Sequence, residues 1–310
     1  MSIGAFDTVL AVDGNDIVGP LRSPRQMLAD QEYDGHTSVH DDETAARLGL
    51  AGAPIEGPTH FSQFDPVGVS LWGSEWFERG CISAHFENMV VEGEQVRPFA
   101  VRSGGASVRI RAEKADGTPV LSGSLSLGPS HPPTELDNRR AALKPAGELF
   151  VLDLMNVGDT SATVRASMTF DERNGNLYPF SLAEKLAVIT EDSPWYRPST
   201  AASSPWGRAV VPTEMISVLA AKCPAAGEVR GPAVGLFMDL EIRMHAGPVF
   251  VDAEYELSRK VVAIGQTRRV EFYWTDTSIV DPATGTLVAS VLLAQGVFKA
   301  SYADYPADRL

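Results

Sequence analysis

Acid–base side chains are concentrated near the amino end of this 310-residue chain. His36 and His40 lie four positions apart, with Asp34 shortly before them, and His60 follows the turn-forming pair Gly57-Pro58. An imidazole changes charge near neutral pH, and a carboxylate beside it can accept or return a proton. The segment 33–60 therefore predicts general acid–base chemistry.

A loop followed by two helices is expected to position these groups. Asp41 is suited to cap a short helix that continues through Glu43-Thr44-Ala45-Ala46. Pro58 suits the first turn of a second helix, which Pro66 must kink or interrupt. Backbone N–H groups at a helix start favour negative charge, so a reacting oxygen is expected to lie near such a start.

Two runs in this stretch carry a family resemblance. The first is His40-Asp-Asp-Glu-Thr-Ala-Ala-Arg-Leu-Gly-Leu, and the second is Ala53-Pro-Ile-Glu-Gly. Together they resemble the MaoC-like hydratase/dehydratase branch of the hotdog fold. In that branch an Asp-x-Asn-Pro-Ile-His segment is followed by Asp-x-x-x-Ala-x-x-x-Gly and a Pro-Ile-x-His-Gly helix start.

Three departures from that pattern bear on the reaction. Thr37-Ser38-Val39-His40 stands where Asn-Pro-Ile-His is expected, Asp34 lies six residues before His40 rather than five, and Glu56 replaces the histidine before Gly57. The resemblance implies a catalytic Asp34/His40 pair, with the Gly57 backbone as donor to an enolate-like oxygen. His36 is extra to the pattern and is expected to replace or assist the displaced aspartate.

The second half has its own version of the segment, Glu191-Asp-Ser-Pro-Trp-Tyr196. Tyr196 stands at the histidine position, and tyrosine is a poor base at neutral pH. This segment is either a degenerate partner that shapes the substrate site or an acid–base pair acting across from His40. The residues expected to bind substrate are Glu56, His60, Glu191, Trp195 and Tyr196. His60 reads equally well as a core histidine, and Trp72, Trp76, Trp195 and Trp206 either line an aromatic site or pack in the core.

The chain reads as two diverged copies of one unit. Pro58-Thr-His-Phe recurs as Pro212-Thr-Glu-Met, and Asp116-Gly-Thr-Pro-Val-Leu-Ser-Gly recurs as Thr284-Gly-Thr-Leu-Val-Ala-Ser-Val. A Pro-containing, charged segment between the copies predicts a solvated linker. The predicted units are residues 1–130, a linker over 131–146, and residues 147–310.

Strand patterns follow the helix start in each copy. Residues 108–111 and 251–257 alternate apolar with polar side chains, and Ala115-Asp116-Gly117 predicts a hairpin turn. Residues 270–275 and 287–294 are rich in β-forming side chains. One helix followed by an antiparallel sheet in each copy predicts an α+β chain. With the resemblance, the expected fold is a double hotdog, in which each repeat wraps a sheet around a central helix.

The amino-acid composition limits the kinds of partner and the location expected for this chain. A formal net charge of -14 and a pI near 4.9 argue against nucleic acid or an anionic membrane. We expect no secretion signal and no membrane span, since the first twenty residues are acidic and no apolar run is long enough. Two cysteines predict neither a disulfide framework nor a cysteine-rich metal site. The prediction is a cytoplasmic homodimer that needs no cofactor or metal.

Several functions fit these residues. The leading hypothesis, implied by the resemblance, is a hydro-lyase that acts on an acyl thioester such as an enoyl-CoA or 3-hydroxyacyl-CoA by Asp/His acid–base catalysis. An alternative is a repurposed hotdog dehydratase, isomerase or cyclase that acts on a small molecule without CoA. A thioesterase and a non-catalytic double hotdog binding protein are further alternatives.

Overall fold

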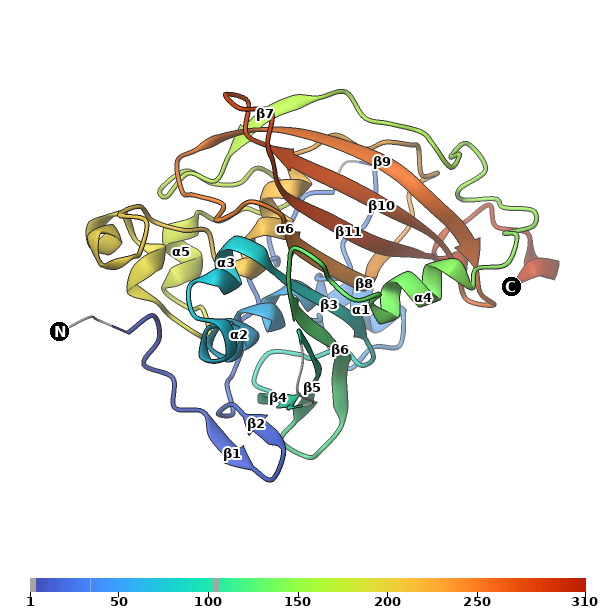
Figure 1. Cartoon of the computed structure of the whole chain (residues 1–310). Coiled ribbons are helices and arrows are strands. Elements are labelled where there is room, and N and C mark those ends of the chain that lie inside the picture. Colours follow the sequence, from blue (N-terminus) through green and yellow to red (C-terminus); the bar gives the residue numbers. More distant parts are fainter. Residues whose placement is uncertain (1–3, 34, 103–105) are drawn as a thin grey trace.

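The computed structural model describes residues 4–33, 35–102 and 106–310, and it is built around one eleven-stranded antiparallel sheet (Figure 1). The sheet order is β1-β2-β4-β5-β6-β3-β8-β11-β10-β9-β7. The strands are β1 (Ala11–Asp13), β2 (Asp16–Val18), β3 (Gly80–Phe86), β4 (Val96–Val101), β5 (Ser107–Lys114), β6 (Pro119–Leu127), β7 (Val164–Ser167), β8 (Gly235–Met244), β9 (Glu254–Gln266), β10 (Val270–Val280) and β11 (Leu287–Phe298).

The helices are short and lie mostly on one side of the sheet. The α-helices are α1 (Asp42–Arg47), α2 (Asp65–Trp72), α3 (Glu75–Arg79), α4 (Glu135–Ala141), α5 (Leu182–Leu186) and α6 (Thr213–Ala221). The 3-10 helices are η1 (Gly57–Phe64), η2 (Pro194–Tyr196), η3 (Pro198–Ser203), η4 (Lys299–Ser301) and η5 (Ala307–Arg309). Within the described ranges, no helix has the length and apolar character needed to cross a membrane.

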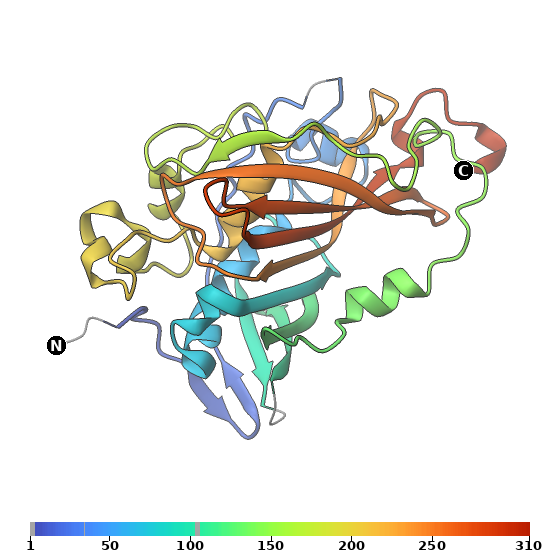
Figure 2. The same ribbon diagram turned by 45° about the horizontal axis from the view of Figure 1, so that its top comes forward.

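The same strand order occurs twice. Apart from β1, β2 and β7, the first half runs β3-β6-β5-β4 and the second half runs β8-β11-β10-β9, so each set of four has its first strand beside its last. The two first strands pair with each other, from Cys81 opposite Arg243 to His85 opposite Asp239. The halves thus share one continuous sheet, which Figure 2 shows tilted by 45° from the view of Figure 1. The turns that the sequence relates, at residues 115–117 and 281–286, join β5 to β6 and β10 to β11, the third and fourth strands of each set of four.

Most predicted strands are present. Val108, Ile110 and Ala112 are buried along β5 while Arg109 is exposed, as the alternation predicts. Residues 270–275 and 287–294 fall in β10 and β11. The strand predicted over 251–257 begins only at Glu254, because residues 251–252 form a turn in which Asp252 has a φ of 59°.

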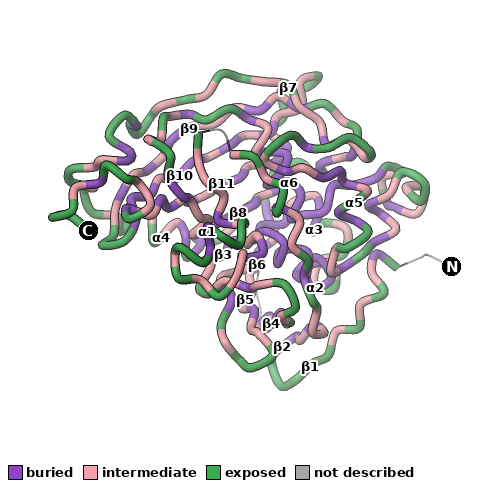
Figure 3. Tube along the Cα trace, turned by 180° about the vertical axis from the view of Figure 1, so that it is seen from behind, coloured by how far each residue is buried: buried purple, intermediate pink, exposed green. Residues whose placement is uncertain are grey.

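The two central helices pack against each other inside the curved sheet. The first is interrupted as predicted: η1 ends at Phe64, and α2 begins at Asp65 with Pro66 in its first turn. The second, α6, is buried on all sides from Thr213 to Ala220. Figure 3 shows this burial around α6, whereas the β1–β2 hairpin is largely exposed. Because the recurring Pro-Thr motifs begin η1 and α6, the two copies meet at these helices.

The segment predicted as a solvated linker is in part ordered against the sheet. Thr134 caps α4, and its hydroxyl also donates a 2.9 Å hydrogen bond to Glu241 of β8. Leu136, a residue of α4 itself, is buried. The linker is therefore only partly solvated, because this helix covers buried polar side chains at the junction of the halves. The exact boundaries of the two units stay a prediction.

Candidate active site

Two adjoining chambers lie beside the central helices. The smaller chamber has a volume of about 480 Å³ and the larger one about 740 Å³. The side chains that line both chambers form a shared wall, and they come from both halves of the chain: Tyr33, Leu177, Tyr178, Ala221, Ala225, Arg259, Tyr273 and Gln295. The two chambers therefore adjoin along this wall.

His40 lines the smaller chamber in a fixed orientation. Its Nδ1 lies 2.6 Å from the carbonyl oxygen of Pro54, which can only accept, so Nδ1 carries the proton and Nε2 has the lone pair. Burial lowers the pKa of His40, since the charged imidazolium is poorly solvated there. The Ser38 hydroxyl accepts the His40 backbone N–H at 3.1 Å and fixes the loop. His40 is thus a neutral imidazole suited to accept a proton.

Glu56 lines the same chamber at the start of η1. Burial raises the pKa of its carboxyl group to about 7, against hydrogen bonding from Tyr178 and the positive charge of Lys185. The Tyr178 hydroxyl donates to Oε1 at 2.5 Å. A carboxyl group with this pKa exists in both protonation states near neutral pH. It can therefore donate a proton to a reacting group or accept one.

Gly57 follows Glu56 and cannot be replaced without disturbing the chamber wall. A Cβ added at Gly57 would lie 2.7 Å from the ring of Phe86. Phe86, at the end of β3, lines the smaller chamber. Only glycine lets the start of η1 pass this close beneath the ring.

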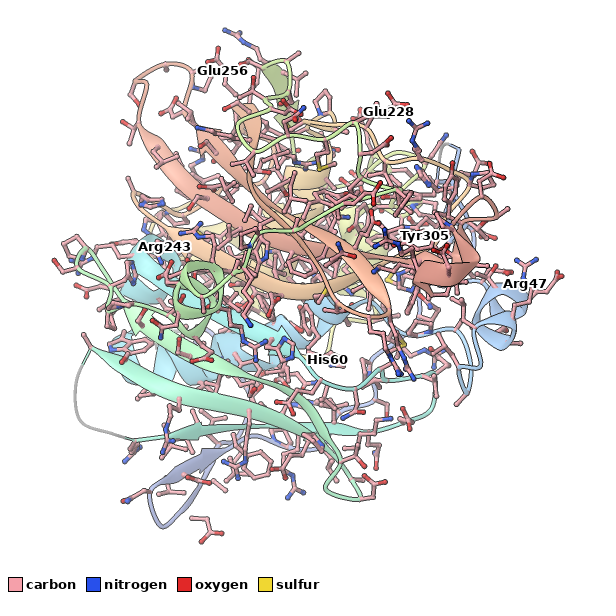
Figure 4. All side chains as sticks on the ribbon, turned by 90° about the vertical axis from the view of Figure 1, so that its right-hand side faces the viewer. Arg47, His60, Glu228, Arg243, Glu256 and Tyr305 are labelled. Atoms are coloured by element: carbon pink, nitrogen blue, oxygen red, sulfur yellow. The ribbon has the colours of Figure 1, made fainter. Side chains whose placement is uncertain are left out.

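His60 lies one turn further along η1. It is both a buried core histidine and a residue of the chamber wall, the two alternatives that the sequence left open. It is 2% exposed, yet it also lines the smaller chamber. Figure 4 shows it in the interior, whereas Arg47 projects from the edge of the molecule. Burial lowers the pKa of His60 to about 4, so the ring is neutral at pH 7. Its Nδ1 has no hydrogen-bond partner among the described residues.

His36 lines the larger chamber rather than the smaller one. Its ring lies 5.3 Å from the ring of Tyr33, and a Cβ added at Gly231 would lie 2.8 Å from it. His36 and His40 therefore face different chambers despite their spacing in the sequence. Asp34, predicted as the second catalytic group, lies outside the described residues.

The second-half segment does not reach either chamber. Glu191 is buried and accepts hydrogen bonds from Thr8 and, at 2.7 Å, from Arg22 Nε. The Tyr196 hydroxyl donates to Asp65 at 2.9 Å. Trp195 packs edge-on against Trp206, with ring centres 5.6 Å apart. The expected substrate contacts of Glu191, Trp195 and Tyr196 are thus misplaced.

The four tryptophans pack against other side chains rather than lining an aromatic site. Trp76 donates to the buried carboxylate of Asp65 at 2.8 Å and stacks on Trp72, and Trp206 packs against Trp195. None of these four indoles is among the described residues that line the two chambers. Aromatic packing, rather than ligand contact, explains their number in this region.

Solved structures share this fold. No protein-family model matches the sequence, and a search of curated proteins found no match. A MaoC domain protein from Chloroflexus aurantiacus J-10-fl, which is named a dehydratase, matches over 96% of this chain and 98% of its own, with 13% identity and a TM-score of 0.55. A conserved hypothetical protein from Mycobacterium tuberculosis, described as having a double hotdog fold, matches over 96% of this chain and 97% of its own, with 13% identity and a TM-score of 0.54. The chain is a double hotdog. The predicted fold class is therefore confirmed, and at this identity the likeness concerns the fold.

The double hotdog brings three side chains to the site that sequence patterns did not indicate. Tyr178 comes from a loop of the second repeat, and Arg259 comes from β9. Lys185 of α5 acts on Glu56 through its positive charge, and its Nζ is 3.4 Å from both Glu214 and the Thr59 hydroxyl. None of them belongs to a motif, and only the pairing of the two repeats places them together.

Proposed function

We propose that this double hotdog is a hydro-lyase that removes water from, or adds water to, an acyl thioester. The observation that carries the proposal is the presence of His40 and Glu56 in one chamber. One is a neutral imidazole with its Nε2 lone pair available, and the other is a carboxyl group with a pKa of about 7. Dehydration needs both a base and an acid.

In the proposed dehydration, one side chain takes a proton from the substrate and another supplies one. His40 Nε2 takes the α-proton of a 3-hydroxyacyl thioester, and the electrons of that C–H bond form the α,β double bond. The bond from the β-carbon to the hydroxyl oxygen breaks, and the Glu56 carboxylic acid supplies the proton that turns the leaving hydroxyl into water. The products are a 2-enoyl thioester and water, and hydration is the reverse.

Negative charge builds on the thioester oxygen as the α-proton leaves. We assign the Gly57 backbone N–H, at the start of η1, as the donor to this oxygen, because a helix start favours negative charge. Asp34 remains a predicted catalytic group. His36 is proposed to contact the acyl part of the substrate in the larger chamber, rather than the reacting carbons.

The test is turnover of a panel of 2-enoyl-CoAs and 3-hydroxyacyl-CoAs by the purified chain. We expect His40→Ala and Glu56→Gln each to lower kcat/KM by about 10²–10⁴-fold, the usual contribution of a general acid or base. His36→Ala is the matched histidine control and should mainly raise KM. No water addition or loss with any substrate, or full activity in His40→Ala, would contradict the proposal.

A small-molecule substrate without CoA is the second candidate, and the charges around the chambers favour it. Among the described lining residues the permanent cations are Arg259 and Lys222, few for a nucleotide carrying several phosphates. Competition by free CoA discriminates between the candidates. Inhibition of turnover by CoA supports the thioester, whereas unchanged turnover at millimolar CoA supports the smaller substrate.

A further inference from the structure

Arg259 is a cation set into the wall that the two chambers share. It lies on β9, and the polar residues Tyr33, Tyr178, Tyr273 and Gln295 line the same shared wall. We call these five residues the polar junction. Around it the larger chamber is partly apolar, with Met155, Leu177 and Val261 in its wall.

The guanidinium group is held in place by neutral oxygens. Its Nε donates to the Thr277 hydroxyl at 3.0 Å, and its Nη2 donates to the carbonyl oxygen of Ala220, near the end of α6, at 2.7 Å. A guanidinium has five N–H donors, and these are its two hydrogen bonds within the described part of the chain. Its positive charge has no carboxylate partner there. The group is therefore fixed in orientation and still able to bind an acceptor.

The three junction tyrosines are neutral donors around this charge. Burial raises the pKa of each phenol, and the charge of Arg259 only partly opposes that effect. All three therefore keep their protons at neutral pH. The Tyr178 hydroxyl donates to Glu56, which leaves the phenols of Tyr33 and Tyr273 as the donors beside Arg259. A fixed, partly exposed cation with phenolic hydroxyls in the same wall favours an anionic oxygen group.

We infer that Arg259 binds a carboxylate of the substrate, so that the natural substrate is an acyl compound with a second, free carboxylate at the far end of its chain. The planar fork of a guanidinium matches a carboxylate through two parallel hydrogen bonds. A single arginine in a partly apolar wall suits one negative charge better than a phosphate dianion. The acyl chain would then extend from His40 in the smaller chamber to Arg259 at the junction.

The inference rests on the proposed function for the thioester end of the substrate, but the anion site is testable without turnover. Isothermal titration compares hexanoate with hexanamide, which has nearly the same shape but no charge. We expect the protein to bind hexanoate about tenfold or more tightly, as a charged hydrogen bond implies. Arg259→Met should abolish that preference. Equal binding of both probes by the wild-type chain, or a preference retained in Arg259→Met, overturns the inference.

A control variant shows whether the preference depends on Arg259 itself or on any nearby positive charge. Lys222→Met removes another cation from the chamber walls and should leave the hexanoate preference unchanged. If Arg259→Met unfolds, Arg259→Lys becomes the test, since it keeps the charge without the fork and should lose part of the preference; an unchanged preference overturns the inference. Stronger competition by inorganic phosphate than by acetate against hexanoate would assign the site to phosphate instead.

Kinetics then distinguish the two proposals. The substrates are a pair of enoyl-CoAs that end in a carboxylate or in its methyl ester. Arg259→Met should lower kcat/KM about tenfold or more for the carboxylate and leave the methyl ester little changed. If neither thioester reacts while the hexanoate preference depends on Arg259, the hydro-lyase proposal fails and the carboxylate site stands.

Discussion

The hydroxyl of Tyr178 donates a 2.5 Å hydrogen bond to Glu56, across 122 positions of sequence and from one repeat to the other. This contact holds the Glu56 carboxylate in its chamber and opposes the rise of its pKa that burial causes. The proposed acid is thus tuned by a side chain from the repeat that lacks the acid–base segment.

Tyr178→Phe should raise the pKa of Glu56 above 7, because burial persists while the hydrogen bond that favours the charged form is lost. Hydrogen bonds to charged groups contribute about 1.5–3 kcal/mol, which corresponds to roughly one pKa unit or more. Since dehydration needs Glu56 protonated, the alkaline limb of the kcat/KM profile should move to higher pH. An unmoved limb, with Tyr255→Phe as the tyrosine control, would show that Glu56 is not the titrating acid.

Glu214→Gln should weaken the pH dependence of folding stability. Glu214 is buried in α6, and burial raises its pKa from 4.5 to about 7. The folded chain therefore keeps a proton that the unfolded chain has lost, so this group's contribution to stability falls as pH rises from 4.5 to 7. Urea unfolding at pH 5 and pH 7.5 should show the wild-type chain losing roughly 2–3 kcal/mol more than the variant.

Burial lowers the pKa of His60 to about 4, so His60 makes folding stability rise with pH. This contribution is present in both proteins and cancels in the comparison. Parallel stability curves for the wild-type chain and Glu214→Gln would mean that Glu214 does not hold a proton in the folded state at pH 5.

Gly57→Ala should destabilise the chain and distort the smaller chamber. The new methyl group would lie 2.7 Å from the Phe86 ring, and overpacking of this kind costs about 1–3 kcal/mol. Phe86→Leu in the same chain should recover part of the loss, because a smaller side chain leaves room for the methyl group. A double-mutant cycle by thermal unfolding measures this coupling. If the stability changes of the two single variants simply add in the double variant, the methyl group and the Phe86 ring do not clash.

Trp195→Ala should lower stability without changing substrate binding. Trp195 is nearly buried and packs against Phe77 and Trp206, so its removal leaves a cavity that costs about 3–5 kcal/mol. Phe86→Ala, on the chamber wall, is the matched aromatic control and should raise KM. A raised KM in Trp195→Ala, at a temperature where the variant is folded, would show that Trp195 contributes to substrate binding after all.

Local features of the fold could be predicted from the sequence. Asp41 caps α1 as expected and accepts the Thr44 backbone N–H at 2.8 Å, because a capping bond depends on neighbours in the chain. The interruption at Pro66 follows from the missing N–H of proline and is equally local. Strand β5 shows its alternation because one face of that strand is polar.

Other features depend on contacts between distant segments. Strand β8 carries Asp239 and Glu241, which are nearly buried because α4, His85 and Thr134 cover and bind them. No local pattern predicts that a strand with such charges lies at the centre of the sheet. The same holds for Glu191, which lies far from His40 because Arg22 and Thr8 bind its carboxylate in the core.

Only the part of the candidate site that comes from the first half of the chain could be predicted from the sequence. His40, Glu56, Gly57 and His60 were identified from one stretch, and all four line the smaller chamber. Tyr178 and Arg259 complete the described wall from the other repeat, and each is a single residue without a motif. Their roles follow from the pairing of the two repeats, which a reading of single segments does not supply.

The cluster of Phe77, Trp195, Tyr196 and Trp206 gives the duplication a lasting asymmetry. Aromatic rings pack around residues 191–196, the segment that corresponds to the His40 loop, and no residue of that segment is among the described residues that line the chambers. The second copy thus contributes wall residues such as Tyr178 and Arg259 to the chambers, while its own equivalent of the His40 loop is packed with aromatic rings.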